Sequence, residues 1–173
     1  MALSPLNQRR WTNFKRNKRA LWSLIIFSVL FTLSLFAEFI ANDKPILVSY
    51  RGEIYAPVFK FYPETQFGGD FRTEAVYSDP EVRCLITTGG NIDCFDEPEA
   101  LIEQADQGIE TGDDFHKGWM LWPVIPFKYD TIVDVRGVAP SAPDGSNWLG
   151  TDDTKRDVLA RVIYGFRLSI FYT

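Results

Sequence analysis

The longest apolar stretch of the chain lies near its N-terminus. Residues 20–37 (ALWSLIIFSVLFTLSLFA) carry no charge, and the stretch continues to Ala41 with Glu38 as its one charged residue. A bilayer hydrocarbon core of about 30 Å needs roughly 20 helical residues. A helix that is apolar all round is rarely the core of so small a domain. The pattern therefore predicts a transmembrane helix at residues 20–41.

A cleaved signal peptide is the main alternative for this stretch. Signal peptides have an apolar region of about 7–15 residues and a cleavage site with small residues at −3 and −1. A cut after Ala37 would place Leu35 at −3, and a cut after Ala41 would place Phe39 there. These bulky residues and the length of the stretch favour an uncleaved anchor.

The charge pattern gives the anchor a direction. Six bases precede it, namely Arg9, Arg10, Lys15, Arg16, Lys18 and Arg19. Clustered Lys and Arg stay cytoplasmic, so residues 1–19 are expected inside and residues 42–146 outside the cytoplasmic membrane. Residues 42–146 are strongly acidic, with 19 Asp and Glu against eight Lys and Arg. The chain has no basic stripe or nucleic-acid motif, which argues against a nucleic-acid partner.

The acidic segment mixes strand and helix signals. Residues 46–50 and 53–59 alternate as two strands that Arg51-Gly52 joins in a hairpin. Residues 96–105 predict a helix with Asp96 as its cap and Gly108 as its stop. The aromatic run at 118–129, with its two prolines, could be core, a belt at the membrane interface or a docking surface.

Cys84 and Cys94 are the only cysteines. The residues around Gly89-Gly90 suggest a second hairpin, in which the two cysteines would lie opposite each other. In an oxidising compartment this favours a structural disulfide. A zinc or redox site is the weaker alternative, because the spacing is not Cys-x-x-Cys and His116 is the only histidine.

Catalytic motifs are absent from the sequence. No Gly-x-Ser-x-Gly, EF-hand loop or P-loop occurs. We therefore expect no catalytic, cofactor-binding or metal-binding residues, and we do not expect an enzyme.

The last segment, residues 147–173, predicts an amphipathic helix at the outer interface. Thr151 or Asp152 is expected to cap it, and Asp152–Arg156 and Asp157–Arg161 are acid-before-base pairs four residues apart. The apolar side continues into a second membrane segment just as the chain reaches its last residue. The expected fold is thus a membrane protein fragment: one N-terminal transmembrane helix, an α+β extracytoplasmic insertion, then an interfacial helix leading into a truncated second span.

The same segment resembles the region before the core transmembrane bundle in permease subunits of bacterial peptide-import ABC transporters. The matching positions are Gly150, Thr151, Asp152, Arg156, Asp157, Val158, Arg161, Tyr164, Gly165, Arg167 and Ser169. Three positions depart from the pattern: Asn147 stands where histidine is common, Lys155 where glycine is common, and Ala160 where serine is common.

Residues 36–45, 62–71 and 122–127 narrow the resemblance to the inner-membrane permease of microcin C and oligopeptide importers, which carries a large insertion after its first span. The resemblance implies a multi-pass subunit of the bacterial inner membrane. Its partners would be a second permease, a cytoplasmic ATPase subunit that binds the ATP, and a periplasmic peptide-binding protein. The alternative is a stand-alone, single-span membrane-anchored periplasmic binding or adaptor protein.

Overall fold

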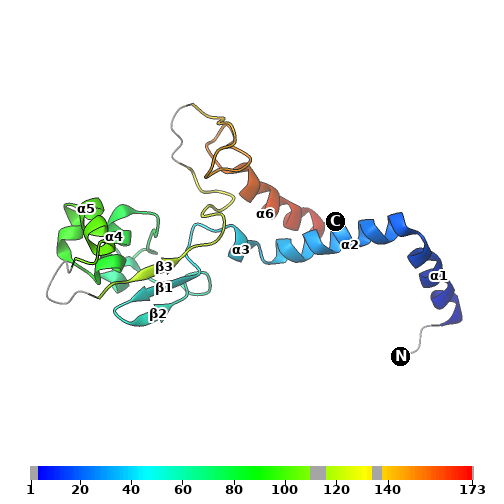
Figure 1. Ribbon diagram of the computed structural model, residues 1–173, viewed down its shortest axis with the longest axis horizontal. Helices are drawn as coiled ribbons and strands as arrows, with labels where there is room; N and C mark the ends of the chain where they lie inside the picture. Colours follow the sequence, from blue (N-terminus) through cyan, green and yellow to red (C-terminus); the bar gives the residue numbers. More distant parts are fainter. Residues whose placement is uncertain (1–3, 110–115, 134–137, 173) are drawn as a thin grey trace.

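The computed structural model describes residues 4–109, 116–133 and 138–172. It has two parts, a helical arm and a lobe built on a small sheet (Figure 1). The arm contains α1, α2 and α6, and α3 lies where the arm meets the lobe. The lobe contains β1–β3, α4 and α5.

The arm begins with α1 (Pro5–Arg16), α2 (Lys18–Leu35) and α3 (Ala37–Ile40). Asn17 separates the first two helices, and its side-chain oxygen accepts a hydrogen bond from the Ala20 N–H at 3.4 Å. Among the described residues, α2 is the one helix long and apolar enough to cross a membrane. The predicted helix over 20–41 is interrupted at Phe36 (ψ 22°), so α3 is a separate turn at its outer end.

The lobe is built on a three-stranded antiparallel sheet of order β2-β1-β3. The strands are β1 (Leu47–Tyr50), β2 (Glu53–Tyr55) and β3 (Trp119–Leu121). Arg51 and Gly52 both have positive φ, as a tight two-residue hairpin turn requires. The second strand ends earlier than the sequence suggested. The aromatic run supplies β3, which pairs with β1 in the register Val48 with Met120.

The hairpin predicted around Gly89-Gly90 is wrong. This region forms α4 (Pro80–Thr88), the 3-10 helix η2 (Ile92–Phe95) and, after it, α5 (Pro98–Asp106). Asp79 caps α4 by accepting the Glu81 N–H at 3.2 Å, and Gly89 ends the helix at φ 81°. Glu97, rather than Asp96, occupies the N-cap position of α5. Local start and stop signals therefore outweigh the strand propensity of residues 84–88.

The lobe has its own hydrophobic core. Phe67, at the end of the 3-10 helix η1 (Glu64–Phe67), is fully buried. Its ring meets those of Tyr50, Tyr55 and Tyr77 edge to face, with centroids 5.5, 5.6 and 5.9 Å away. A second cluster forms where the arm meets the motif segment, and it includes Ala37, Ala41, Ile125, Ala160 and Tyr164.

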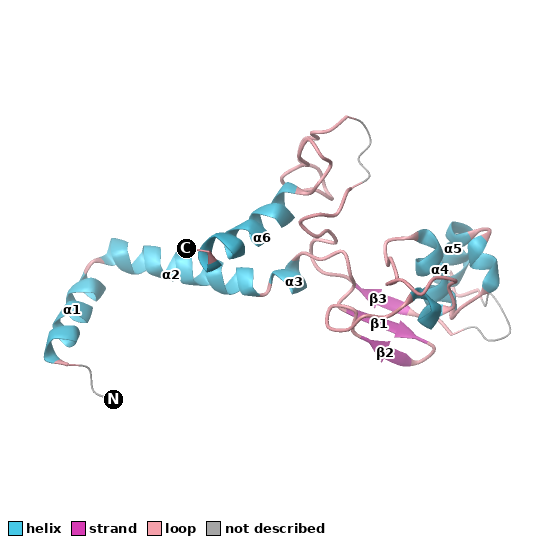
Figure 2. Cartoon of the chain, turned by 180° about the vertical axis from the view of Figure 1, so that it is seen from behind, coloured by secondary structure: helices cyan, strands magenta, loops and turns pink. Residues whose placement is uncertain are grey.

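The last helix, α6 (Val158–Phe171), returns to the first span. It lies beside α2 in both views (Figures 1 and 2). Phe27 contacts Phe166, and Phe31 contacts Phe171, with ring centroids 6.0 and 6.3 Å apart. The first and the last apolar segments of the sequence thus pack against each other.

Candidate functional site

The family-motif segment forms a closed turn before α6. The Asp152 carboxylate organises it: Oδ1 accepts the N–H groups of Thr154 and Arg156, both at 2.9 Å. The guanidinium of Arg161 binds the other oxygen, Oδ2. The hydrogen bond from the Arg156 N–H is the largest of the causes that lower the pKa of Asp152 to about 2. The turn is therefore held by an ionised carboxylate.

The helix predicted to begin at Thr151 or Asp152 instead begins at Val158. Asp157 is its cap; it is 1% exposed and accepts the Ala160 N–H at 2.7 Å. The expected pair of Asp152 with Arg156 on one helix face is replaced by the pair of Asp152 with Arg161, nine residues on. The reason is that residues 152–156 fold back on themselves before the helix starts.

Lys155 has a left-handed backbone at φ 59°. The turn requires this conformation, because Asp152 N–H donates to the Arg156 carbonyl at 3.0 Å and Lys155 N–H donates to the Asp152 carbonyl at 3.1 Å. Glycine adopts a left-handed conformation freely, whereas a residue with a Cβ does not. Glycine, the residue that the motif resemblance leads us to expect at this position, would therefore fit the turn without this strain.

Gly150 and Thr151 join the turn to the preceding segment, residues 138–146, which we call the connector. A Cβ added to Gly150 would lie 2.3 Å from the Ser141 carbonyl oxygen, and the residue also has φ 72°. The Thr151 hydroxyl lies 2.9 Å from the Ser141 hydroxyl. Glycine at 150 is thus required by both the backbone and the close approach of the connector.

A polar cluster ties α6 to the outer end of the first span. Tyr164 Oη lies 2.8 Å from both Glu38 Oε2 and the Ala41 carbonyl oxygen. Arg167 Nη2 lies 3.4 Å from Glu38 Oε1, and the Asn42 side-chain amide donates to Glu38 Oε2 at 3.3 Å. We call Glu38, Asn42, Tyr164 and Arg167 the Glu38 cluster. It joins residues 126 positions apart in the sequence.

Arg167 also stacks on Tyr164, with the guanidinium carbon 5.0 Å from the ring centroid. The Tyr129 ring also lies 5.2 Å from that of Tyr164. The tyrosine, 3% exposed, is therefore fixed from several sides. A carboxylate near the apolar region is costly unless it is paired, and the cluster supplies these partners.

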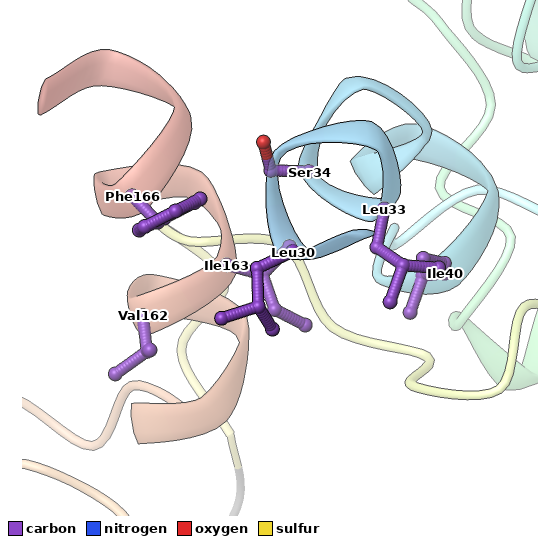
Figure 3. A pocket seen from close by; sticks show the side chains of 7 residues that line it. All are labelled: Leu30, Leu33, Ser34, Ile40, Val162, Ile163 and Phe166. Atoms are coloured by element: carbon purple, nitrogen blue, oxygen red, sulfur yellow. The ribbon is translucent and has the colours of Figure 1, made fainter. Parts of the chain in front are cut away.

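Beyond the cluster, α2 and α6 are separated by an apolar groove of about 230 Å³ (Figure 3). Its lining residues are Leu30, Leu33, Ser34, Ile40, Val162, Ile163 and Phe166. The Ser34 hydroxyl is satisfied by the Phe31 carbonyl at 2.7 Å. The groove offers no group for catalysis or for binding a charged ligand.

Two motif residues lie further along α6. A Cβ added to Gly165 would meet nothing within 4 Å among the described residues, so no contact there demands glycine. The Ser169 hydroxyl donates to the Gly165 carbonyl at 2.9 Å. Small residues let helices approach closely inside membranes, and this face of α6 has that character.

The remaining sequence-predicted residues lie elsewhere. Cys84 and Cys94 form a disulfide in the lobe, with their Cα atoms 5.6 Å apart. Within the residues that the structure describes, no group of three or more His, Cys, Asp or Glu could hold a metal ion. Sequence reasoning missed the partners of Glu38. The available signal in the sequence was that Glu38 is the one charged residue in residues 20–41.

Comparison with known proteins shows what this chain is similar to. Residues 4–67 match the family model described as the N-terminal TM domain of oligopeptide transport permease C. The chain is 42% identical over 171 residues to the inner membrane ABC transporter permease protein YejE of Escherichia coli. It is 39% identical over 194 residues to the peptidoglycan transport system permease protein YejE of Agrobacterium fabrum. No solved structure matches it.

These alignments cover 98% of this chain but only 42% and 43% of the two relatives. The chain therefore spans less than half the length of the curated relatives it matches. The resemblance to an inner-membrane permease of the peptide ABC-importer class is confirmed, as is the expected location in the bacterial inner membrane.

Proposed function

We propose that this chain forms the N-terminal part of the translocation path of an ATP-binding-cassette importer for peptides. The observation that carries the proposal is the alignment of 98% of the chain with two permease proteins. One relative's name adds peptidoglycan transport. We propose short peptides of the oligopeptide or microcin C class as the cargo.

The Glu38 cluster supports a role in building the permease rather than in chemistry. It fixes the start of α6 against the outer end of the first span, through Tyr164 and Arg167. The closed turn at Asp152 then sets the direction in which α6 enters the membrane. Such a framework positions helices that line a path.

The proposed topology follows the charge pattern. Residues 1–19 are cytoplasmic, 20–41 form the first span, 42–146 form an α+β periplasmic insertion, and 147–173 lead into the second span. A disulfide between Cys84 and Cys94 supports this orientation, because the bacterial periplasm is oxidising and the cytoplasm is reducing.

The proposed partners are a second permease subunit, a cytoplasmic ATPase subunit and a periplasmic peptide-binding protein. ATP would bind to the ATPase, since this sequence has no P-loop. The acidic insertion faces the compartment in which a peptide-binding protein would dock.

Affinity capture from gently solubilised membranes tests the assembly. We expect an ATPase subunit and a second permease to copurify in near-equal amounts. The Glu38→Gln variant should retain less of both, whereas Glu99→Gln, a change at an exposed acid of α5, should retain both. Recovery of the protein without an ATPase would contradict the proposal and favour the stand-alone adaptor.

A further inference from the structure

A short aromatic loop of the lobe lies against the outer end of the first span. The loop comprises residues 56–63 (APVFKFYP), and we call it the Phe59 loop. The Phe59 ring contacts that of Phe39 in α3, with centroids 5.5 Å apart. Phe39 in turn contacts Phe36 at 6.4 Å. The aromatic surface of the membrane helix therefore continues directly onto the lobe.

The loop is ordered but leaves its large rings uncovered. The Ala56 carbonyl accepts the N–H groups of Phe59 and Lys60 at 3.1 and 3.2 Å, which closes a helix-like turn. Despite this order, Phe59 is 73% exposed and Phe61 is 56% exposed. The turn thus presents two phenylalanines outward, whereas the core of the lobe buries Phe67 and Tyr77.

The position of the loop relative to the bilayer follows from the length of the span. About 20 helical residues cross the hydrocarbon core. Counting from Lys18, at the start of α2, this places the outer boundary near α3 (Ala37–Ile40). Because Phe59 contacts α3, the loop lies at the depth where lipid headgroups meet acyl chains. Amphipathic aromatic and basic side chains are favoured at that depth.

The charge of the loop also favours contact with lipid headgroups. Residues 42–146 hold 19 acids, yet the Phe59 loop has none, and Lys60 stands between its two phenylalanines. Lys60 Nζ lies 5.5 Å from the Tyr62 ring centroid. An anionic phospholipid headgroup would be repelled by most of the insertion but accepted at this loop.

We propose that the Phe59 loop inserts into the outer leaflet of the inner membrane, with Phe59 and Phe61 among the upper acyl chains and Lys60 at the headgroup phosphates. The loop anchors the lobe to the bilayer at a second point besides the first span. This restricts the tilt of the insertion over the mouth of the permease. The inference goes beyond the transport role and rests on α2 crossing the membrane.

Depth-dependent quenching tests the proposal. Single cysteines replacing Phe59, Phe61, Ile92 or Ile26 are labelled with an environment-sensitive fluorophore under non-reducing conditions. Each labelled chain is reconstituted in bilayers of phosphatidylethanolamine and phosphatidylglycerol that carry nitroxide groups either just below the headgroup, to report on the loop, or deep in the acyl chains, to report on Ile26. Ile92, 76% exposed on η2, is the matched surface control, and Ile26 in α2 marks the membrane interior.

We expect quenching at Phe59 and Phe61 to exceed that at Ile92 by at least about twofold, as for side chains inserted at the interface. Equal quenching at Phe59, Phe61 and Ile92, with Ile26 quenched, would overturn the proposal and leave the permease assignment intact. Protection of the loop from both the lipid nitroxide and aqueous iodide would overturn it in favour of a protein partner. An unquenched Ile26 would overturn both proposals, since the span would not be in the bilayer.

Discussion

The lobe and the helical arm place similar apolar and aromatic side chains differently: the lobe buries them, and the arm exposes them. In the lobe, aromatic side chains such as Phe67 and Tyr77 are buried against one another. In the arm, most large apolar side chains of α2 are exposed, for example Trp22 at 63% and Ile26 at 54%. A lobe in water gains stability by burying apolar area. A helix in lipid gains nothing from this, so its position is set by packing and polar contacts.

This comparison explains where the polar groups lie. The lobe is held by its core and the Cys84–Cys94 disulfide. The arm depends on a few specific contacts, those of the Glu38 cluster and the Asp152 turn. Substitutions in the lobe should therefore destabilise it in proportion to the buried volume that they remove. Substitutions in the arm should matter where they remove a single hydrogen-bonding group.

The largest effect is expected in the lobe core. Phe67→Ala removes a fully buried ring with several aromatic neighbours and should lower the free energy of unfolding by about 3–5 kcal/mol. Phe71→Ala, at a ring that is 63% exposed, should change it by less than about 0.5 kcal/mol. Denaturant unfolding of the chain in nanodiscs, monitored by protease cleavage within the lobe, measures the free energy of unfolding of both variants. Similar losses for the two variants would contradict the assigned core.

The next effect concerns the arm alone. Glu38→Gln keeps the size of the side chain but removes the charge that Arg167 pairs with. The Glu38 side chain is 39% exposed, so losing this charge-assisted contact should cost about 1 kcal/mol. Cysteines at Phe27 and Phe166, whose rings are 6.0 Å apart, should therefore crosslink less efficiently in this variant. The lobe should unfold as in the parent chain, and an unchanged crosslinking yield would show that the cluster does not hold α6.

A smaller effect is expected at Lys155. Replacing it by glycine relieves a left-handed backbone that costs about 1–2 kcal/mol for a residue with a Cβ. The greater freedom of glycine in the unfolded chain offsets part of this gain, so the turn should be stabilised by at most about 1 kcal/mol. Hydrogen exchange of the peptide covering residues 150–158 should slow. Lys155→Ala is the control, because it removes the charge and keeps the Cβ, and it should give no such slowing.

The smallest effect is a pH dependence of the same turn. Asp152 has a pKa lowered from 3.8 to about 2, chiefly by the Arg156 N–H. Since the folded pKa lies below the unfolded one, the carboxylate stabilises the turn above about pH 4, and this contribution is lost as the pH falls towards 2. Hydrogen exchange of residues 150–158, corrected for intrinsic rates, should show this loss. Asp152→Asn should remove the dependence, and a dependence that persisted there would assign it to another group.

Some parts of the candidate site are visible in the sequence. The apolar stretch, the bases before it and the motif residues were each visible locally, because a membrane helix and its caps depend on neighbours in sequence. The predicted start of α6 was wrong, because acid–base spacing alone does not reveal a left-handed residue at Lys155. The second hairpin was wrong because Gly89 ends a helix instead of turning a strand.

By itself, then, the sequence predicted a membrane-crossing helix and its direction, and it indicated which permease family the chain resembles. Only the tertiary structure decided that Glu38 meets Tyr164 and Arg167, that β3 pairs with β1, and that the Phe59 loop lies against α3. The physical reason is separation along the chain. Helix formation, capping and charge bias depend on residues a few positions apart, whereas these contacts join segments 20 or more residues apart and form only once the elements pack together.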